Sequence, residues 1–144
     1  MIKYVFVYGS LRPDDDSAQP WTRDAVAGMI AEKARLPRAK LYHDRYACVV
    51  LESLEDRSKT KTSLSDSYVH GYVLSTSDKE MFKQKLSLFD RIEGYNGPGS
   101  LNLYDRTVVD VELESRTVMA YVYHGSHRCS KRNLIPSGDW LQRT

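Results

Sequence analysis

The feature that most constrains the fold is a series of short segments in which β-branched and aromatic residues dominate or alternate with polar ones. The clearest case is the stretch 104–125, where YDRTVVDVELE is followed by Ser-Arg and then by TVMAYVYHG. Two such runs joined by a two-residue turn predict a β-hairpin. Strict alternation places one set of side chains on one face of the first strand, namely Thr107, Val109, Val111 and Leu113.

Other parts of the chain have the composition of strands. They are the segments 2–8, 39–53 and 68–76. The middle segment divides into two short strands hinged near Asp44, and Gly71 predicts a bulge in the last one. The segment 23–35 leaves two structures open. One is a helix weakened by Gly28, and the other is a strand around 31–36.

One helix is predicted between Ser77 and Gly94. Ser77 with Glu80 three residues later is typical of a capping box, and Gly94 is a natural stop. The apolar residues at helical spacing are Phe82, Leu86, Phe89 and Ile92. Because the strands are mostly joined by hairpins or short loops, the pattern predicts an α+β fold with a mixed, mainly antiparallel, barrel-like sheet. We expect a single domain over residues 1–144.

Composition excludes several classes of function. The 144 residues carry a formal charge of +2, too small to predict a nucleic-acid surface. No apolar run is long enough to span a bilayer, and no signal peptide is recognisable, so we expect no membrane partner and a cytoplasmic location. Cys48 and Cys129 match no metal or redox spacing. The acids Asp14, Asp15 and Asp16 are typical of a solvated loop, so no metal site is predicted.

The first predicted strand ends in Tyr8, Gly9, Ser10 and Leu11. Gly9 allows the backbone to turn sharply or to approach another group closely. Successive N–H groups after a strand can also hold an anion. An ordinary strand end followed by a loop is the alternative interpretation.

Glu93 stands directly before the glycine that ends the predicted helix, between apolar neighbours. The negative end of the helix dipole and an apolar environment both disfavour a charged carboxylate, so they would raise its pKa into the range of a general base. A glutamate at a frayed helix end is the alternative. The remaining helix acids, Asp78, Glu80 and Asp90, are expected on a solvated face or at the helix N-terminus.

A serine, two histidines and two tyrosines are further candidates for chemistry. Ser10 lacks the Gly-x-Ser-x-Gly context and an evident His/Asp partner, so a binding role through its N–H is expected rather than covalent catalysis. His124 and His127 lack an acidic third ligand, which favours structural or solvent roles. Tyr121 and Tyr123 share one face of the last strand and could line a pocket or pack in a core.

Five motifs occur in order along the chain: VFVYGSL, FDRIEGY, YDRTVVDV, AYVYHG and SGDW. In this order the sequence resembles the γ-glutamylcyclotransferase-like family, which includes γ-glutamylamine cyclotransferases and plant stress-induced homologues. The resemblance implies a small mixed-strand β-barrel with flanking helices. It also implies that Tyr8, Gly9, Ser10 and Leu11 hold the substrate's carboxylate and that Glu93 is catalytic. Roles for Tyr104 and Arg106 in the family's Tyr-x-Arg motif are implied as well.

The implied reaction closes a γ-glutamyl amine or γ-glutamyl amino acid to 5-oxoproline and releases an amine, with Glu93 as general acid and base. It requires neither a metal nor an organic cofactor. The partner is then a small γ-glutamyl molecule, and the sequence leaves the substrate and the oligomeric state open. The Gly97-Pro98-Gly99 loop is expected to gate or narrow the site. The alternative is a non-catalytic module that keeps the pocket and binds a small anion or a protein.

Overall fold

The structure is a computed structural model of residues 1–144. It describes residues 2–9, 11–13, 25–44, 46–51, 67–125 and 133–142. The predicted exposed loop 55–67 falls almost entirely outside this part of the chain. Cys129 also lies outside it.

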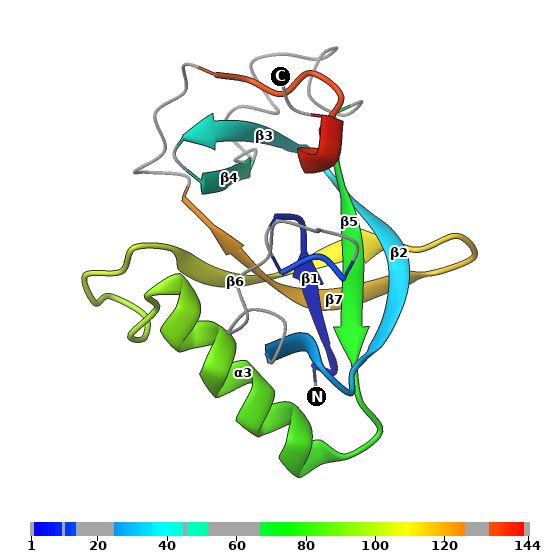
Figure 1. Ribbon diagram of the computed structural model, residues 1–144, viewed down its shortest axis with the longest axis vertical. Coiled ribbons are helices and arrows are strands. Elements are labelled where there is room, and N and C mark those ends of the chain that lie inside the picture. Colours follow the sequence, from blue (N-terminus) through cyan, green and yellow to red (C-terminus); the bar gives the residue numbers. More distant parts are fainter. Residues whose placement is uncertain are drawn as a thin grey trace.

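Five strands close into a barrel in the order β1–β5–β2–β6–β7 (Figure 1). Their bounds are β1 Tyr4–Val7, β2 Ile30–Pro37, β5 Tyr68–Ser75, β6 Asp105–Glu112 and β7 Thr117–His124. β1 and β7 run parallel, and the other neighbouring strands run antiparallel. The predicted α+β fold with a small mixed-strand barrel is therefore confirmed.

The hairpin and the uncertain segment are both settled by strand pairing. β6 and β7 pair from Asp105↔His124 to Glu112↔Thr117, which confirms the predicted hairpin. The strand alternative around 31–36 is confirmed by β2, while Ala25 and Val26 at the start of the segment are helical. β2 pairs with β5 along its whole length. The hydrogen bonds between these two strands satisfy backbone N–H and C=O groups that a helix weakened by Gly28 would have to satisfy within its own segment.

A second, two-stranded sheet lies over one end of the barrel (Figure 1). It consists of β3 Ala39–Asp44 and β4 Tyr46–Leu51, which confirms the predicted division near Asp44. The chain end packs against it, since the N–H of Ile135 donates to the carbonyl of Leu41 at 2.8 Å. Ile135 and Trp140 of this segment are both buried, and Trp140 begins the short 3-10 helix η1 Trp140–Gln142.

The predicted helix is present as α3 Lys79–Glu93, but its N-cap residue is not the predicted one. Asp78, not Ser77, is the N-cap, and its carboxylate accepts from the N–H groups of Glu80 and Met81. A carboxylate has the additional advantage of a negative charge beside the positive end of the helix dipole. Gly94 ends the helix at φ 68°, as predicted, in the left-handed conformation that glycine adopts without strain.

Alternation along β1 divides the core in two. Phe6 and Tyr8 point into the barrel, whereas Val5 and Val7 point outward beneath α3. The inner cluster continues into β3 and β4 and includes Leu36, Leu41, Val49, Val73, Val122 and Trp140. The outer cluster includes Leu11, Leu74, Phe82, Phe89 and Tyr123. Tyr8 is therefore held inside the barrel, near the end that the small sheet covers.

Gly71 does not form the predicted bulge. It pairs with Ala34 in an unbroken register between β2 and β5. A Cβ at Gly71 would lie 2.1 Å from the carbonyl oxygen of Val7. The glycine is therefore required by the close approach of β1. Apart from a bulge, such a close approach of another backbone is a common reason for a glycine inside a strand.

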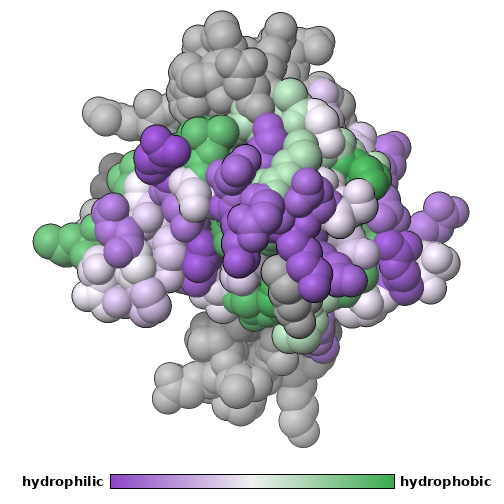
Figure 2. All heavy atoms as spheres, turned by 90° about the horizontal axis from the view of Figure 1, so that it is seen from below, coloured by the Kyte–Doolittle hydropathy of each residue, from purple (hydrophilic) through white to green (hydrophobic). Residues whose placement is uncertain are grey.

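The face seen from below in Figure 1 is largely hydrophilic, with hydrophobic residues in scattered small groups (Figure 2). Such scattered apolar groups are normal for a protein surface. Within the described residues, no helix has the length and apolar character needed to cross a membrane.

Candidate active site

Tyr8 and Glu93, far apart in the sequence, come together at the covered end of the barrel. Tyr8 is buried, and its hydroxyl donates to the main-chain oxygen of Tyr123 at 2.5 Å. Burial raises the pKa of Tyr8 well above its usual value, and the charge of Glu93 raises it further. The Tyr8 hydroxyl is therefore a neutral donor at physiological pH, and it lies within electrostatic reach of the Glu93 carboxyl group.

Main-chain hydrogen bonds fix the end of α3, where Glu93 lies. The Glu93 carbonyl accepts from the N–H of Tyr104 at 3.2 Å, and the Gly94 carbonyl accepts from Leu103 at 3.0 Å. The residue Glu93 as a whole is partly exposed to solvent. Burial of its carboxyl group nevertheless raises the pKa of that group from 4.5 to about 7. The direction agrees with the prediction, and the cause is loss of solvent around the carboxylate.

Tyr104 and Cys48 complete the surroundings of the Tyr8 hydroxyl, because both also raise the pKa of Tyr8, after burial and Glu93. Tyr104 donates its hydroxyl to the carbonyl of Ala47 at 3.0 Å. Cys48 is buried. The strand β4 thus lies over the same end of the barrel as the first turn. It contributes the Cys48 thiol, and its Ala47 carbonyl accepts from the Tyr104 phenol.

The turn after β1 is shaped by close packing. A Cβ at Gly9 would lie 2.7 Å from the Cβ of Ala47, so Gly9 is needed for the approach of β4. The Gly9 carbonyl accepts from the N–H of Arg12 at 2.9 Å, and Leu11 is buried in the cluster beneath α3. Ser10, whose N–H was predicted to bind the substrate, lies outside the described residues.

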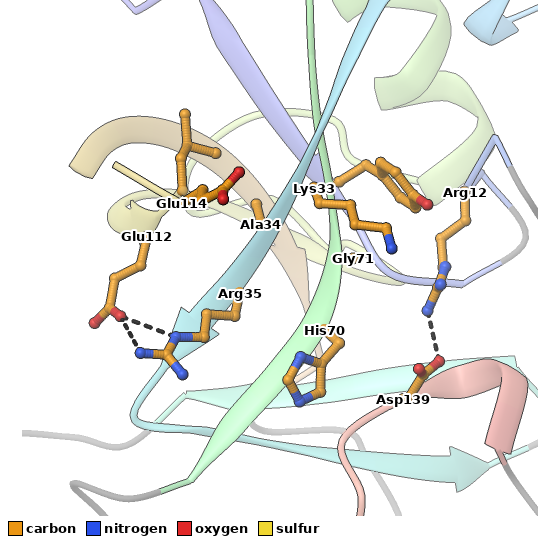
Figure 3. Close-up of a pocket in the computed structure, with 11 residues that line it drawn as sticks. Arg12, Lys33, Ala34, Arg35, His70, Gly71, Glu112, Glu114 and Asp139 are labelled. Atoms are coloured by element: carbon orange, nitrogen blue, oxygen red, sulfur yellow. Dashed lines mark hydrogen bonds and ion pairs between the residues drawn. The ribbon is translucent and has the colours of Figure 1, made fainter. Parts of the chain in front are cut away.

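Arg12 fixes the far side of this turn. Its side chain is only 6% exposed, and its guanidinium contacts the carboxylate of Asp139 at 2.7 Å (Figure 3). Asp139 belongs to the SGDW motif and also accepts from the N–H of Leu141 at 3.0 Å. The pair therefore ties the turn after β1 to the end of the chain.

A separate open groove of about 460 Å³ lies on the outer face of β2 and β5 (Figure 3). Arg12 and Asp139 form one side of it, and the ion pair between Arg35 and Glu112 at 3.0 Å lies on the opposite side. Its lining includes none of the site residues predicted from the sequence. Because charges of both signs face it, its composition is that of an ordinary solvated surface.

The loop after α3 is fixed by one buried side chain. Asn102 is 2% exposed and accepts from the N–H of Asn96 at 2.6 Å. Its amide donates to the carbonyl of Gly97 and to the carboxylate of Asp105, each at 3.0 Å. The predicted gate, Gly97-Pro98-Gly99, is therefore part of a closed and internally bonded loop. Its gating role stays a prediction.

Some of the remaining candidate residues have a described position, and the others lie outside the described part of the chain. Tyr121 and Tyr123 share the outer face of β7, as predicted, and pack in the cluster beneath α3. His124 hydrogen-bonds to the hydroxyl of Thr107 at 2.8 Å. Residues 14–16 and His127 lie outside the described chain.

Sequence reasoning was wrong about Asp90, which it placed on a solvated face or at the helix N-terminus. Arg106 binds the Asp90 carboxylate at 2.7 Å, and both side chains are largely covered. The spacing Asp-x-x-Glu was visible in the sequence, but the pairing with Arg106 of β6 depends on how α3 lies against the barrel.

Residues 5–142 match the family described as gamma-glutamyl cyclotransferase, AIG2-like. The chain belongs to this family. The match covers nearly the whole sequence and confirms the resemblance inferred from the five motifs. It supports a cyclotransferase-type function at the level of the family.

Solved structures agree with the fold of this AIG2-like protein. An uncharacterised protein from Pyrococcus horikoshii is 17% identical at a TM-score of 0.57, over 96% of this chain and 89% of that one. A protein from Arabidopsis thaliana is 21% identical at a TM-score of 0.58, over 90% and 72%. An AIG2-like protein from Mus musculus is 14% identical at a TM-score of 0.51, over 99% and 84%. At these identities the likeness concerns the fold alone. No functionally curated protein matches the sequence significantly.

Proposed function

We propose that this protein is a γ-glutamyl cyclotransferase that converts a γ-glutamyl amine or γ-glutamyl amino acid to 5-oxoproline and a free amine. Glu93 is the general acid and base. The observation that carries the proposal is the buried carboxyl group of Glu93 at the end of α3, close enough to Tyr8 of the family's Tyr-Gly-Ser-Leu turn for its charge to raise the pKa of that phenol. Membership of the AIG2-like family supports the same reaction class.

The pKa of Glu93 suits both halves of the reaction. The substrate's α-ammonium group must lose a proton before its nitrogen can attack, and the Glu93 carboxylate accepts that proton. The nitrogen then bonds to the γ-carbonyl carbon and loses its second proton to solvent, and the bond from that carbon to the leaving nitrogen breaks. Glu93 returns the proton to the leaving amine. A group whose pKa lies near the working pH can accept and donate a proton with little change in free energy.

Positioning supplies most of the remaining acceleration. The nucleophile and the electrophile belong to one molecule, so the protein has only to hold the γ-glutamyl chain folded, which contributes roughly 7 kcal/mol or more in favourable cases. We assign the α-carboxylate to the main-chain N–H groups of the turn formed by Gly9, Ser10 and Leu11. The step is redox-neutral, and every atom transferred comes from the substrate or Glu93.

The test measures 5-oxoproline release from γ-glutamyl-ε-lysine, γ-glutamyl-alanine and glutathione by the wild type and by Glu93→Gln. We expect turnover of at least one compound by the wild type and a loss of about 100-fold or more in the variant, as for removal of a general base. Glu80→Gln is the matched control, since it makes the same change at an exposed position on the same helix.

Two results would contradict the proposal. One is full activity of folded Glu93→Gln, which would remove Glu93 from the chemistry. The other is a wild type that binds a γ-glutamyl compound without turning it over, which is the behaviour of a binding module.

A further inference from the structure

Asp90 lies one helical turn before Glu93 on α3 and is held by two side chains from the barrel. Nη1 of Arg106 contacts both carboxylate oxygens, at 2.9 and 2.7 Å. The Tyr123 hydroxyl donates to Oδ1 of the same carboxylate at 2.6 Å. The acidic side chain therefore links the last turn of α3 to β6 and β7 by charge-assisted hydrogen bonds, which are stronger than neutral ones.

Aromatic rings fix the orientation of Arg106. Its guanidinium carbon lies 4.8 Å from the ring centre of Tyr95 and 4.7 Å from that of Tyr121. Tyr95 follows the end of α3, and its N–H donates to the Asp90 carbonyl at 2.8 Å. Main chain and side chain of Asp90 are thus both engaged, which restrains the helix end that carries Glu93.

Tyr123 joins the two halves of the candidate site. Its main-chain oxygen accepts from the Tyr8 hydroxyl at 2.5 Å, and its side-chain hydroxyl donates to Asp90 at 2.6 Å. The former contact fixes the end of β1, and the latter fixes the end of α3. A single residue of β7 therefore sets the spacing between the turn after β1 and Glu93.

We infer that Tyr123, through its hydroxyl bond to the Asp90–Arg106 pair, is a positioning residue that holds Glu93 at the correct distance from the substrate bound at the β1 turn. The inference rests on the proposed function. The ion pair is neutral as a unit, so its contribution is orientation of the helix end and not charge at Glu93. An error of about 1 Å in such an orientation can cost about 100-fold in rate.

The experiment compares Tyr123→Phe with the wild type in steady-state kinetics on whichever γ-glutamyl compound is turned over. The variant keeps the ring and the main-chain bond to Tyr8 but loses the bond to Asp90. We expect kcat to fall about tenfold or more, with KM within about twofold, because the β1 turn that binds the carboxylate is untouched. A purely structural role would not separate kcat from KM in this way.

Tyr4→Phe is the matched control, because it removes a tyrosine hydroxyl near Arg116 from the opposite end of β1. We expect its kinetics to equal those of the wild type. Arg106→Lys keeps a positive charge opposite Asp90 but loses the planar group that stacks between the two rings, so we expect an intermediate loss of kcat. This variant also decides the question if Tyr123→Phe does not fold.

A readout independent of activity separates this inference from the proposed function. Hydrogen exchange at the Tyr95 N–H reports how firmly Asp90 holds the helix end. We expect faster exchange in Tyr123→Phe and unchanged exchange in Tyr4→Phe. Unchanged kcat in Tyr123→Phe, or a loss matched by Tyr4→Phe, would overturn the inference. An inactive wild type would instead refute the proposed function, and exchange would then show only whether the tether exists.

Discussion

Gly9 and Ala47 face each other so closely that a Cβ added at Gly9 would lie 2.7 Å from the Cβ of Ala47. This contact brings β4 over the end of β1, where Tyr8 lies within electrostatic reach of Glu93. The glycine of the Tyr-Gly-Ser-Leu turn therefore has a packing role in addition to any role of its N–H in binding.

We expect Gly9→Ala to lower the free energy of unfolding by about 1–3 kcal/mol, as overpacking of a close contact does. Ala47→Gly in the same chain should recover part of that loss, because it removes the methyl group that the new Cβ meets. Urea unfolding of the two single variants and the double variant measures the coupling. Strictly additive losses would mean that the two residues do not limit each other.

The raised pKa of Glu93 should make the stability of the protein depend on pH. Between pH 4.5 and about 7 the folded protein holds a proton that the unfolded chain has lost, so stability falls as pH rises through this range. The rise from 4.5 to about 7 corresponds to at most about 3 kcal/mol. The measurement is the difference in unfolding free energy between Glu93→Gln and the wild type, at pH 5 and at pH 8. We expect the variant to gain relative to the wild type at pH 8, and a constant difference would contradict the assigned burial.

Activity should rise with pH on the acidic side. In the proposed reaction Glu93 must be ionised to accept the substrate's proton, and burial raises its pKa to about 7. We therefore expect kcat/KM to show an acidic limb with a midpoint near pH 7, since this profile reports groups of the free enzyme. A midpoint near 4.5 would indicate that a solvated carboxylate acts in place of a buried one.

Arg12 and Asp139 should matter for both stability and substrate binding. Arg12→Met keeps much of the side-chain volume but leaves the largely covered Asp139 carboxylate without its main partner, which we expect to cost about 2–4 kcal/mol. Because Arg12 fixes the turn after β1, KM should rise more than kcat falls. Arg116→Met is the matched control, since it breaks an ion pair with Glu32 whose side chains are both well exposed. Equal losses of stability in the two variants would refute the role of burial at Arg12.

Much of the fold follows from local patterns. Alternation identified the β6–β7 hairpin, because strand side chains alternate whatever lies opposite them. Composition identified the two short strands β3 and β4. Gly94 was identified as the helix end because its conformation is a local requirement. The N-cap was misassigned, because Ser77 and Asp78 are both good caps and lie next to each other.

The errors at Gly71 and Asp90 have a common cause. Gly71 is required by the carbonyl of Val7, and Asp90 is bound by Arg106 and Tyr123, all of which are distant in sequence. Similarly, the segment 23–35 could not be assigned from the sequence, because the strand β2 depends on its pairing with the distant strand β5.

The sequence by itself determined the described strands other than β2, the helix, its glycine stop and the family. Each of these depends on residues a few positions apart or on motifs in a fixed order. Only the tertiary structure decided which carboxyl group is buried and which is paired. Glu93 and Asp90 share one helix, yet burial raises the pKa of Glu93 while Arg106 and Tyr123 hold Asp90. The physical reason is that desolvation and ion pairing depend on what the barrel places against each carboxylate.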